Sequence, residues 1–212
     1  LRHIVMLEKR GFYETKISLK ASDVARTVLA YRIMAQKVDY PLHLGITESG
    51  SLRSGSVKSA VGLGILLSEG IGDTLRVSLA SDPVDEVTVA FEILKSLRLR
   101  QKGVNVVACP SCGRVQIDVD KLTLEIEKEL SHIDAPITVA VMGCEVNGPG
   151  EAREADIGVA GGHKRALMFM KGEKVGLVEY ADIKKNLVRE VEILAAQWAE
   201  ASAKDMSGSG DA

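Results

Sequence analysis

The fold class follows from residues 73–97, DTLRVSLASDPVDEVTVAFEILKSL. The first part alternates apolar and polar residues and predicts a strand over residues 74–79, because side chains alternate across a strand. Ser81, Asp82 and Pro83 then supply a helix cap with proline at the first helical position. Apolar residues at helical spacing extend the predicted helix to about Leu97. The stretch is therefore a β-strand followed by an α-helix.

Two similar units precede it. The first combines a strand over residues 13–19 with a helix over residues 23–37, for which Ser22 is the expected N-cap. The second combines a strand over residues 41–46 with a helix over residues 56–68. Strand–helix units of about 30 residues are typical of a (β/α) barrel or an open doubly wound sheet. Three units cannot close a barrel, so we expect the chain, which starts at Leu1, to be the later part of a longer protein.

A second, smaller α/β domain is expected after residue 100. Its predicted elements are strands over residues 104–108, 137–142, 156–160, 166–170 and 174–178, a helix over residues 119–130, and an amphipathic helix from Ile183. Residues 143–151 contain too many glycines and prolines for a regular element. The predicted organisation is a partial barrel over residues 1–100, a second domain over 101–204 and a disordered tail over 205–212.

Composition excludes several classes of function. The 212 residues carry a formal net charge of −2 and only 4% aromatic residues, which argues against a nucleic-acid partner. The sequence has no apolar stretch close to the roughly 18–20 residues of a membrane span, so we expect no membrane partner. Three cysteines cannot all pair within one chain, which favours a reducing, cytoplasmic location.

The cysteines are the strongest chemical signal. Cys109 and Cys112 form a C-x-x-C pair directly after one predicted strand, and Cys144 follows the next predicted strand. Thiolates at the ends of two parallel strands can converge on one centre, and such soft ligands favour zinc or an iron–sulfur cluster. A structural zinc site needs a fourth Cys or His, and no second close pair is present. A cluster accepts three thiolates, but the spacing alone leaves both possibilities open.

The surrounding motifs carry a resemblance. CPSCGR at residues 109–114, VMGCEVNGPGEA at 141–152 and ADIGVAGG at 155–162 resemble the 4-hydroxy-3-methylbut-2-en-1-yl diphosphate synthase family of the non-mevalonate isoprenoid pathway. HLGITESG at 43–50, VKSAVGLG at 57–64 and DTLRVSL at 73–79 extend the resemblance over nearly the whole chain. It implies an α/β fold in which the last part of a TIM-type (β/α) barrel precedes a smaller α/β iron–sulfur domain.

The resemblance also implies roles for individual residues. One 4Fe-4S cluster would be bound by Cys109, Cys112, Cys144 and Glu151. The carboxylate of Glu151 would bind the one iron atom at which the substrate later takes its place. The residues expected to bind the substrate's diphosphate are Lys20, Arg76 and Ser78. Glu48 and Asn147 are expected to orient or protonate the departing oxygen.

The implied reaction is the two-electron reductive ring opening of 2-C-methyl-D-erythritol 2,4-cyclodiphosphate to 4-hydroxy-3-methylbut-2-enyl diphosphate, with loss of a hydroxyl. Reduced flavodoxin or ferredoxin would supply the electrons, and the family's members are homodimers. Two alternatives remain from the residues themselves. A ferredoxin-like electron-transfer module would normally show a fourth cysteine, and a zinc-stabilised binding module would contain zinc and be colourless.

Overall fold

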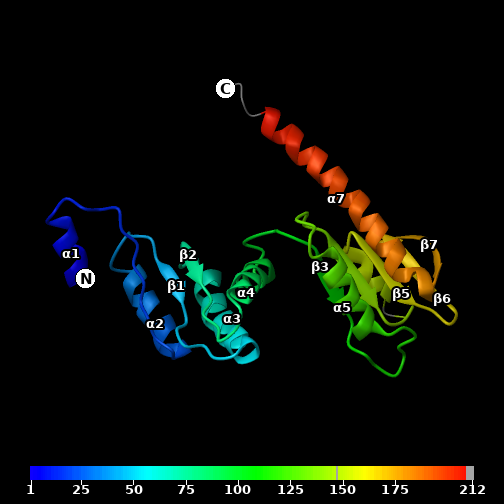
Figure 1. Cartoon of the computed structure of the whole chain (residues 1–212), viewed down its shortest axis with the longest axis horizontal. Coiled ribbons are helices and arrows are strands. Elements are labelled where there is room, and N and C mark those ends of the chain that lie inside the picture. The colour runs from blue at the N-terminus through cyan, green and yellow to red at the C-terminus, as the bar shows by residue number, and fades with distance from the viewer. Residues whose placement is uncertain (147, 209–212) are drawn as a thin grey trace. The chain divides into compact units, whose positions relative to one another are not determined.

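The computed structural model describes residues 1–146 and 148–208, except for the side chains of residues 149, 151, 152 and 205–208. The chain divides into two compact units, Leu1–Arg100 and Gln101–Ala212, which we call unit 1 and unit 2. Both combine helices with parallel strands, which confirms the predicted α/β class. Figure 1 shows the order of the elements along the chain.

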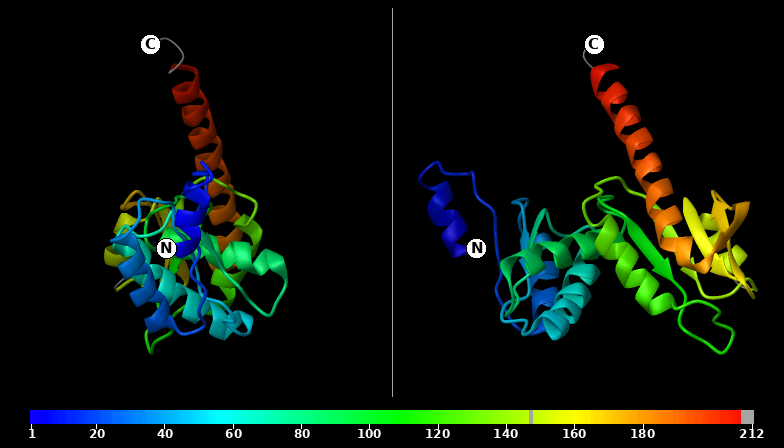
Figure 2. Two further views of the ribbon diagram at one scale, coloured as in Figure 1. Left: turned by 90° about the vertical axis from the view of Figure 1, so that its left-hand side faces the viewer. Right: turned by 45° about the vertical axis from the view of Figure 1, so that its right-hand side comes forward.

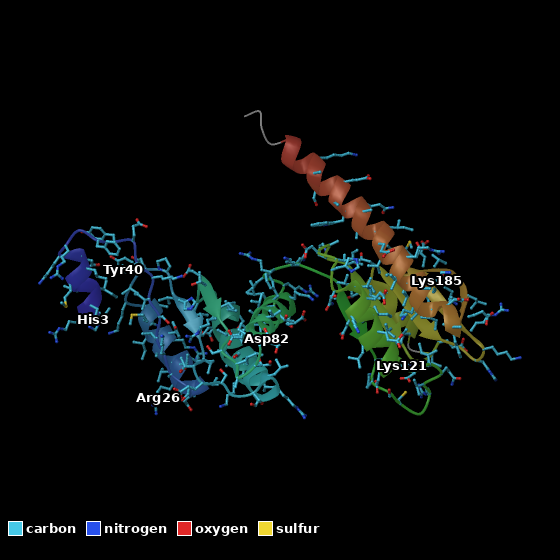
Figure 3. The ribbon with its side chains drawn as sticks, viewed as in Figure 1. His3, Arg26, Tyr40, Asp82, Lys121 and Lys185 are labelled. Atoms are coloured by element: carbon cyan, nitrogen blue, oxygen red, sulfur yellow. The ribbon has the colours of Figure 1, made fainter. Side chains whose placement is uncertain are left out.

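Unit 1 contains two parallel strands and the helices that follow them. Strand β1 (His43–Gly45) pairs with β2 (Thr74–Arg76) in the register His43↔Thr74 and Gly45↔Arg76. Helices α2 (Val24–Ala35), α3 (Leu52–Ser68) and α4 (Pro83–Ser96) alternate with them along the chain. A short helix, α1 (Arg2–Glu8), precedes these elements, and the hydroxyl of Tyr40 (Figure 3) donates a hydrogen bond of 3.0 Å to Glu8.

The predicted strand over residues 13–19 is present only as one parallel bridge between Ile17 and Leu42. Ile17 donates to the carbonyl of Pro41 at 2.8 Å, and His43 donates to the carbonyl of Ile17 at 2.7 Å. Pro41 has no N–H group, so the hydrogen-bond ladder cannot extend in that direction. The position of this segment beside β1 is nevertheless that of a neighbouring parallel strand.

Short polar side chains set the starts of the helices. Asp23, not Ser22, caps α2, because its carboxylate accepts from the N–H of Arg26 at 2.7 Å. Asp82 (Figure 3) caps α4 ahead of Pro83, as predicted. Helix α3 begins at Leu52, about one turn before the predicted start at residue 56, since the serines and Gly55 of that loop are tolerated in the first turn.

The core of unit 1 lies between the strands and the helices. Its largest fully buried side chains include Tyr31 of α2, Leu44 of β1, and Leu63 and Leu66 of α3. Leu75, Val77 and Leu79 from β2 and the residues after it pack on the same cluster. One face of the strands is therefore apolar and covered by helices.

Unit 2 is a mixed five-stranded sheet with two helices. The strands are β3 (Asn105–Ala108), β4 (Thr138–Met142), β5 (Ile157–Gly161), β6 (Arg165–Met170) and β7 (Glu173–Glu179), paired in that order. The first three run parallel, and the last two add antiparallel hairpins. Helix α5 (Val119–Leu130), at the predicted bounds, and helix α7 (Ile183–Gly208) pack on each other and on this sheet.

Two predictions for unit 2 are corrected. Gly148–Glu151 forms a single helical turn, α6, followed by a 3₁₀ turn over Ala152–Glu154, although this region was expected to lack regular structure. Helix α7 continues to Gly208, so the backbone of residues 205–208 is helical and not a disordered tail. Both views in Figure 2 show α7 as one long helix. Residues 209–212 lie outside the description. None of the helices in the described ranges combines the length and apolar composition needed to cross a membrane.

Candidate functional site

Two of the three cysteines lie at the same edge of the unit 2 sheet. Cys109 follows β3 and Cys144 lies two residues after β4, and these strands are parallel neighbours in the register Ala108↔Val141. The N–H of Cys109 donates to the carbonyl of Val141 at 3.3 Å. The N–H of Gly143 in turn donates to the sulfur of Cys109 at 3.1 Å. The segment that carries Cys144 is therefore bonded directly to the Cys109 side chain.

Glycines allow the backbone segments around these cysteines to pack closely. A Cβ added to Gly161, at the end of β5, would lie 2.6 Å from the carbonyl oxygen of Gly143. The same oxygen accepts a hydrogen bond of 2.8 Å from the N–H of Gln116. A Cβ on Gly143 would lie 2.8 Å from Val115 and 3.5 Å from the sulfur of Cys109. Three segments thus meet with no room for a further side-chain atom.

The remaining predicted cluster ligands are placed less closely. Cys112 is exposed on the loop after β3, whereas Cys144 is buried. Glu151 ends α6, but its side chain lies outside the description, and so does the whole of Asn147. Among the described side chains, no three His, Cys, Asp or Glu residues form a group that could hold a metal ion. The structure brings the segments of Cys109 and Cys144 together and leaves Cys112 at the surface.

The chemistry of these residues fits an iron–sulfur cluster. Thiolates are the usual ligands of such clusters, and hydrogen bonds from N–H groups to the sulfur atoms are among the contacts that set the reduction potential. The Gly143 N–H already makes such a contact with Cys109. Cys112 is exposed on the irregular loop between β3 and α5, where its position is not set by a strand or a helix.

Unit 1 has a second candidate site on the strand face opposite its core. The helix-facing residues Ile17, Leu19, Leu42, Leu44, Leu75 and Val77 belong to the apolar cluster. Because side chains alternate, the residues between them belong to the other face, which we call the open face. Its members are Lys16, Ser18, Lys20, His43, Gly45, Thr74, Arg76 and Ser78. Three are cations and none is acidic, whereas the interior of a (β/α) barrel is normally filled by branched apolar residues.

Arg76 is the best-defined residue of the open face. Its guanidinium lies against the backbone of Gly45, where an added Cβ would come within 2.9 Å of Nη2. Its Nε atom is buried, and no hydrogen-bond partner for it is found among the described residues. A buried guanidinium N–H without an acceptor is costly, which makes this atom a candidate donor to an anionic ligand.

The charges of the open face act on His43. The pKa of His43 is lowered by burial and by the positive charges of Lys16, Arg76 and Lys20. Nδ1 of His43 lies 2.8 Å from the hydroxyl oxygen of Thr74 on the paired strand. The sequence assigned no chemical role to His43. The signal that could have indicated one is its position between Lys20 and Arg76 on a shared strand face.

Glu48 lies in the loop after β1 with an exposed side chain and a φ of 53°. Residues other than glycine rarely adopt this left-handed conformation, which costs on the order of 1 kcal/mol and is enriched at functional sites. The neighbouring Ser49 is buried and donates to the carbonyl of Ile46 at 3.0 Å. These contacts fix the loop at the carboxyl end of β1, where parallel-strand folds place their chemistry.

Comparison with known proteins identifies the family. Residues 1–91 match the model for the GcpE TIM-barrel domain, and residues 105–193 match that for the GcpE protein C-terminal domain. The chain belongs to the GcpE family. The boundary between the two GcpE domains falls in the same region as the boundary between units 1 and 2.

Eight curated relatives of this GcpE chain carry one name, 4-hydroxy-3-methylbut-2-en-1-yl diphosphate synthase (flavodoxin). The protein of Geobacter sulfurreducens is 62% identical over 197 residues, which cover 93% of this chain and 56% of the relative. The protein of Magnetococcus marinus is 54% identical over 204 residues, 96% of this chain and 55% of the relative. The chain spans about half the length of the curated relatives it matches. The resemblance stated from the sequence motifs is confirmed.

Proposed function

We propose that this chain is part of an iron–sulfur reductase that converts 2-C-methyl-D-erythritol 2,4-cyclodiphosphate to 4-hydroxy-3-methylbut-2-enyl diphosphate. The proposal rests on one combination of features in a chain of the GcpE family. Thiols lie together at one edge of the unit 2 sheet, and unit 1 has a cationic strand face. The relatives' name supports flavodoxin as the electron donor, with ferredoxin as a second candidate. Unit 1 would be the last part of a TIM-type barrel and unit 2 an iron–sulfur cluster domain, acting in the cytoplasm as a homodimer.

One 4Fe-4S cluster would be held by the thiolates of Cys109, Cys112 and Cys144 and the carboxylate of Glu151. When bound, such a cluster supplies single electrons at low potential and one iron open to an oxygen ligand. The Gly143 N–H would hold the Cys109 sulfur in place, and the exposed loop would bring Cys112 to the site. A carboxylate is a harder ligand than a thiolate and exchanges more readily.

The open face of unit 1 would bind the diphosphate. Arg76 and Lys20 can donate charge-assisted hydrogen bonds to phosphate oxygens, and the hydroxyl of Ser78 can add a neutral one. The buried Nε of Arg76 would gain an acceptor on binding. Glu48 and Asn147 would orient or protonate the departing oxygen, with Glu48 as the candidate proton donor.

The cluster assignment is tested by anaerobic reconstitution of this chain with iron and sulfide. We expect about four iron and four sulfide atoms per chain, with visible absorbance. Substitution of Cys109, Cys112 or Cys144 by serine should each remove most of the iron. E151Q should weaken the cluster, whereas E154Q, which changes an exposed carboxylate nearby, should not. A colourless protein with zinc in place of iron would instead identify a zinc-stabilised binding module.

The role of Glu48 is tested separately in a reconstituted protein of the length of the curated relatives, because this chain spans only about half of that length. E48Q is expected to abolish turnover with reduced flavodoxin while the absorbance of the cluster stays unchanged, because Glu48 belongs to unit 1 and the cysteines to unit 2. Turnover equal to that of the wild type would exclude Glu48 as the proton donor.

A further inference from the structure

The open face extends further along the strands than the residues assigned to the diphosphate. Arg76 and Ser78 lie at or beyond the carboxyl end of β2, whereas His43 and Thr74 form the first residue pair of the β1–β2 ladder. Lys16 lies one residue before the bridge that joins Ile17 to Leu42. These three residues, Lys16, His43 and Thr74, form a deeper polar layer beneath Arg76, at positions where a closed barrel would normally have apolar packing.

We propose that the anion site of unit 1 extends to His43, and that His43 takes up a proton when a phosphate or diphosphate group binds beside it. The inference rests on the proposed function, because it adds a residue to the diphosphate-binding face. It also explains why Lys16, His43 and Thr74 form a polar layer at positions that sheet packing alone would fill with apolar side chains.

In one tautomer of the neutral ring, binding of an anion at His43 requires a proton. With Nδ1 of His43 bonded to Thr74, Nε2 is the ring nitrogen that can turn toward a ligand. If Nδ1 donates its hydrogen to the hydroxyl of Thr74, a neutral ring presents a lone pair at Nε2, which repels a phosphate oxygen. Transfer of one proton from solvent to Nε2 converts that position into a cationic donor, and no other bond is formed or broken. Both ring nitrogens then have an acceptor.

Burial and the groups around His43 favour its neutral form in the absence of an anion. Lys16 and Lys20 face it from the adjoining segment, and Arg76 faces it from β2. From the helix side the hydroxyl of Tyr31 donates to the carbonyl oxygen of His43 and carries no charge. The nearby carboxylate of Asp73 accepts from the N–H of Leu42 at 2.8 Å. Burial is the main cause of the lowered pKa of His43, and the repulsion from the three cations adds to it. An anion that neutralises these cations removes the repulsion and adds an attraction that raises the pKa.

The first test is a proton NMR titration of the four histidines in the chain without a cluster, with and without inorganic pyrophosphate. We expect pyrophosphate to raise the pKa of His43 by about one unit or more, as an opposite charge within contact distance does. His3, exposed on α1, is the internal control and should shift little. An equal, small shift at both residues would overturn the inference, and this measurement requires no variant.

The second test is calorimetric binding of pyrophosphate in two buffers that differ in heat of ionisation. The wild type should take up more protons than H43Q at neutral pH, and comparison of the two removes the proton change of pyrophosphate itself. Wild-type affinity should exceed that of H43Q by about tenfold at low pH, roughly one charge-assisted hydrogen bond, and the ratio should fall as pH rises. H3Q should behave as wild type.

The outcomes separate this inference from the proposed function. A constant affinity ratio between the wild type and H43Q at all pH values overturns the role of His43, while iron binding by unit 2 and anion binding by Arg76 stand. Loss of pyrophosphate binding in R76Q but not in H43Q likewise overturns the role of His43. Failure of the chain to bind pyrophosphate at all overturns both the inference and the diphosphate assignment, and leaves the thiol site to be judged by its iron content.

Discussion

Substitution of Gly161 by alanine tests the close packing behind the thiol site. The new Cβ would lie 2.6 Å from the carbonyl oxygen of Gly143. Because carbon–oxygen contacts settle near about 3.3 Å, the two segments must separate by about 0.7 Å. The obstructing atom belongs to the backbone, so no side-chain rotation can relieve the contact. Overpacking of this kind costs about 1–3 kcal/mol.

The displacement should reach the cysteines as well as the core. The Gly143 carbonyl also accepts from Gln116 at 2.8 Å, and the Gly143 N–H donates to the Cys109 sulfur at 3.1 Å. A shift of this size would weaken at least one of these hydrogen bonds. We therefore expect G161A to bind clearly less iron than the wild type after anaerobic reconstitution.

Two measurements check this prediction. Urea unfolding of unit 2 can be followed by the fluorescence of Trp198 on α7, the only tryptophan of the sequence. The control is G176A, on the exposed strand β7 of the same unit, where an added Cβ meets no atom within 4 Å. It should change stability by less than about 0.5 kcal/mol and leave iron content unchanged. Wild-type stability and iron content in G161A would refute the argument that this contact positions the thiols.

Three further predictions concern unit 1. Y31F should lower the stability of unit 1 by about 1–3 kcal/mol and speed amide exchange at Leu19, because the buried Tyr31 hydroxyl is hydrogen-bonded to Leu19 and to the carbonyl of His43. Y13F, which changes an exposed tyrosine, should have neither effect. G45A should weaken pyrophosphate binding in calorimetry about tenfold by displacing the Arg76 guanidinium, whereas G64A, with open space around its added Cβ, should leave binding unchanged. The hydrogen bond from Arg32 lowers the pKa of Glu69, so the stability that this carboxylate contributes is present above its unfolded-state pKa and is lost as the pH falls. In urea unfolding, E69Q should therefore be less stable than the wild type at pH 7 and equally stable in acid.

Elements with strong local signals are predicted well from sequence. Helix α5 begins and ends at the predicted residues, because Asp118 caps it and its apolar residues lie on one stripe. Helix α4 starts at Pro83 for the same kind of reason. The parallel pairing of β3 with β4, which brings Cys109 and Cys144 to one edge, follows from the strand–helix–strand pattern.

Features that depend on tertiary contacts are not predictable in this way. The first segment forms only a bridge because Pro41 interrupts its partner, and α6 forms at a Gly-Pro-Gly sequence that local propensity would exclude. The tight contact of Gly161 with Gly143 joins residues from different strands and leaves no periodic trace in the sequence. His43 resembles any strand residue until the register places it opposite Thr74.

The pairing of β3 with β4 determines which changes in the sequence would move Cys109 relative to Cys144. Cys109 and Cys144 are 35 positions apart in the sequence, but strand register, not the length of α5, sets their relationship in space. Exposed residues of α5 could be replaced without moving either thiol, whereas its buried residues Val119, Ile126 and Leu130 hold the helix on the sheet. A single residue inserted into β3 would instead rotate Cys109 to the opposite face of the sheet, because side chains alternate along a strand. The tolerance of this chain to insertions should therefore be lowest in β3.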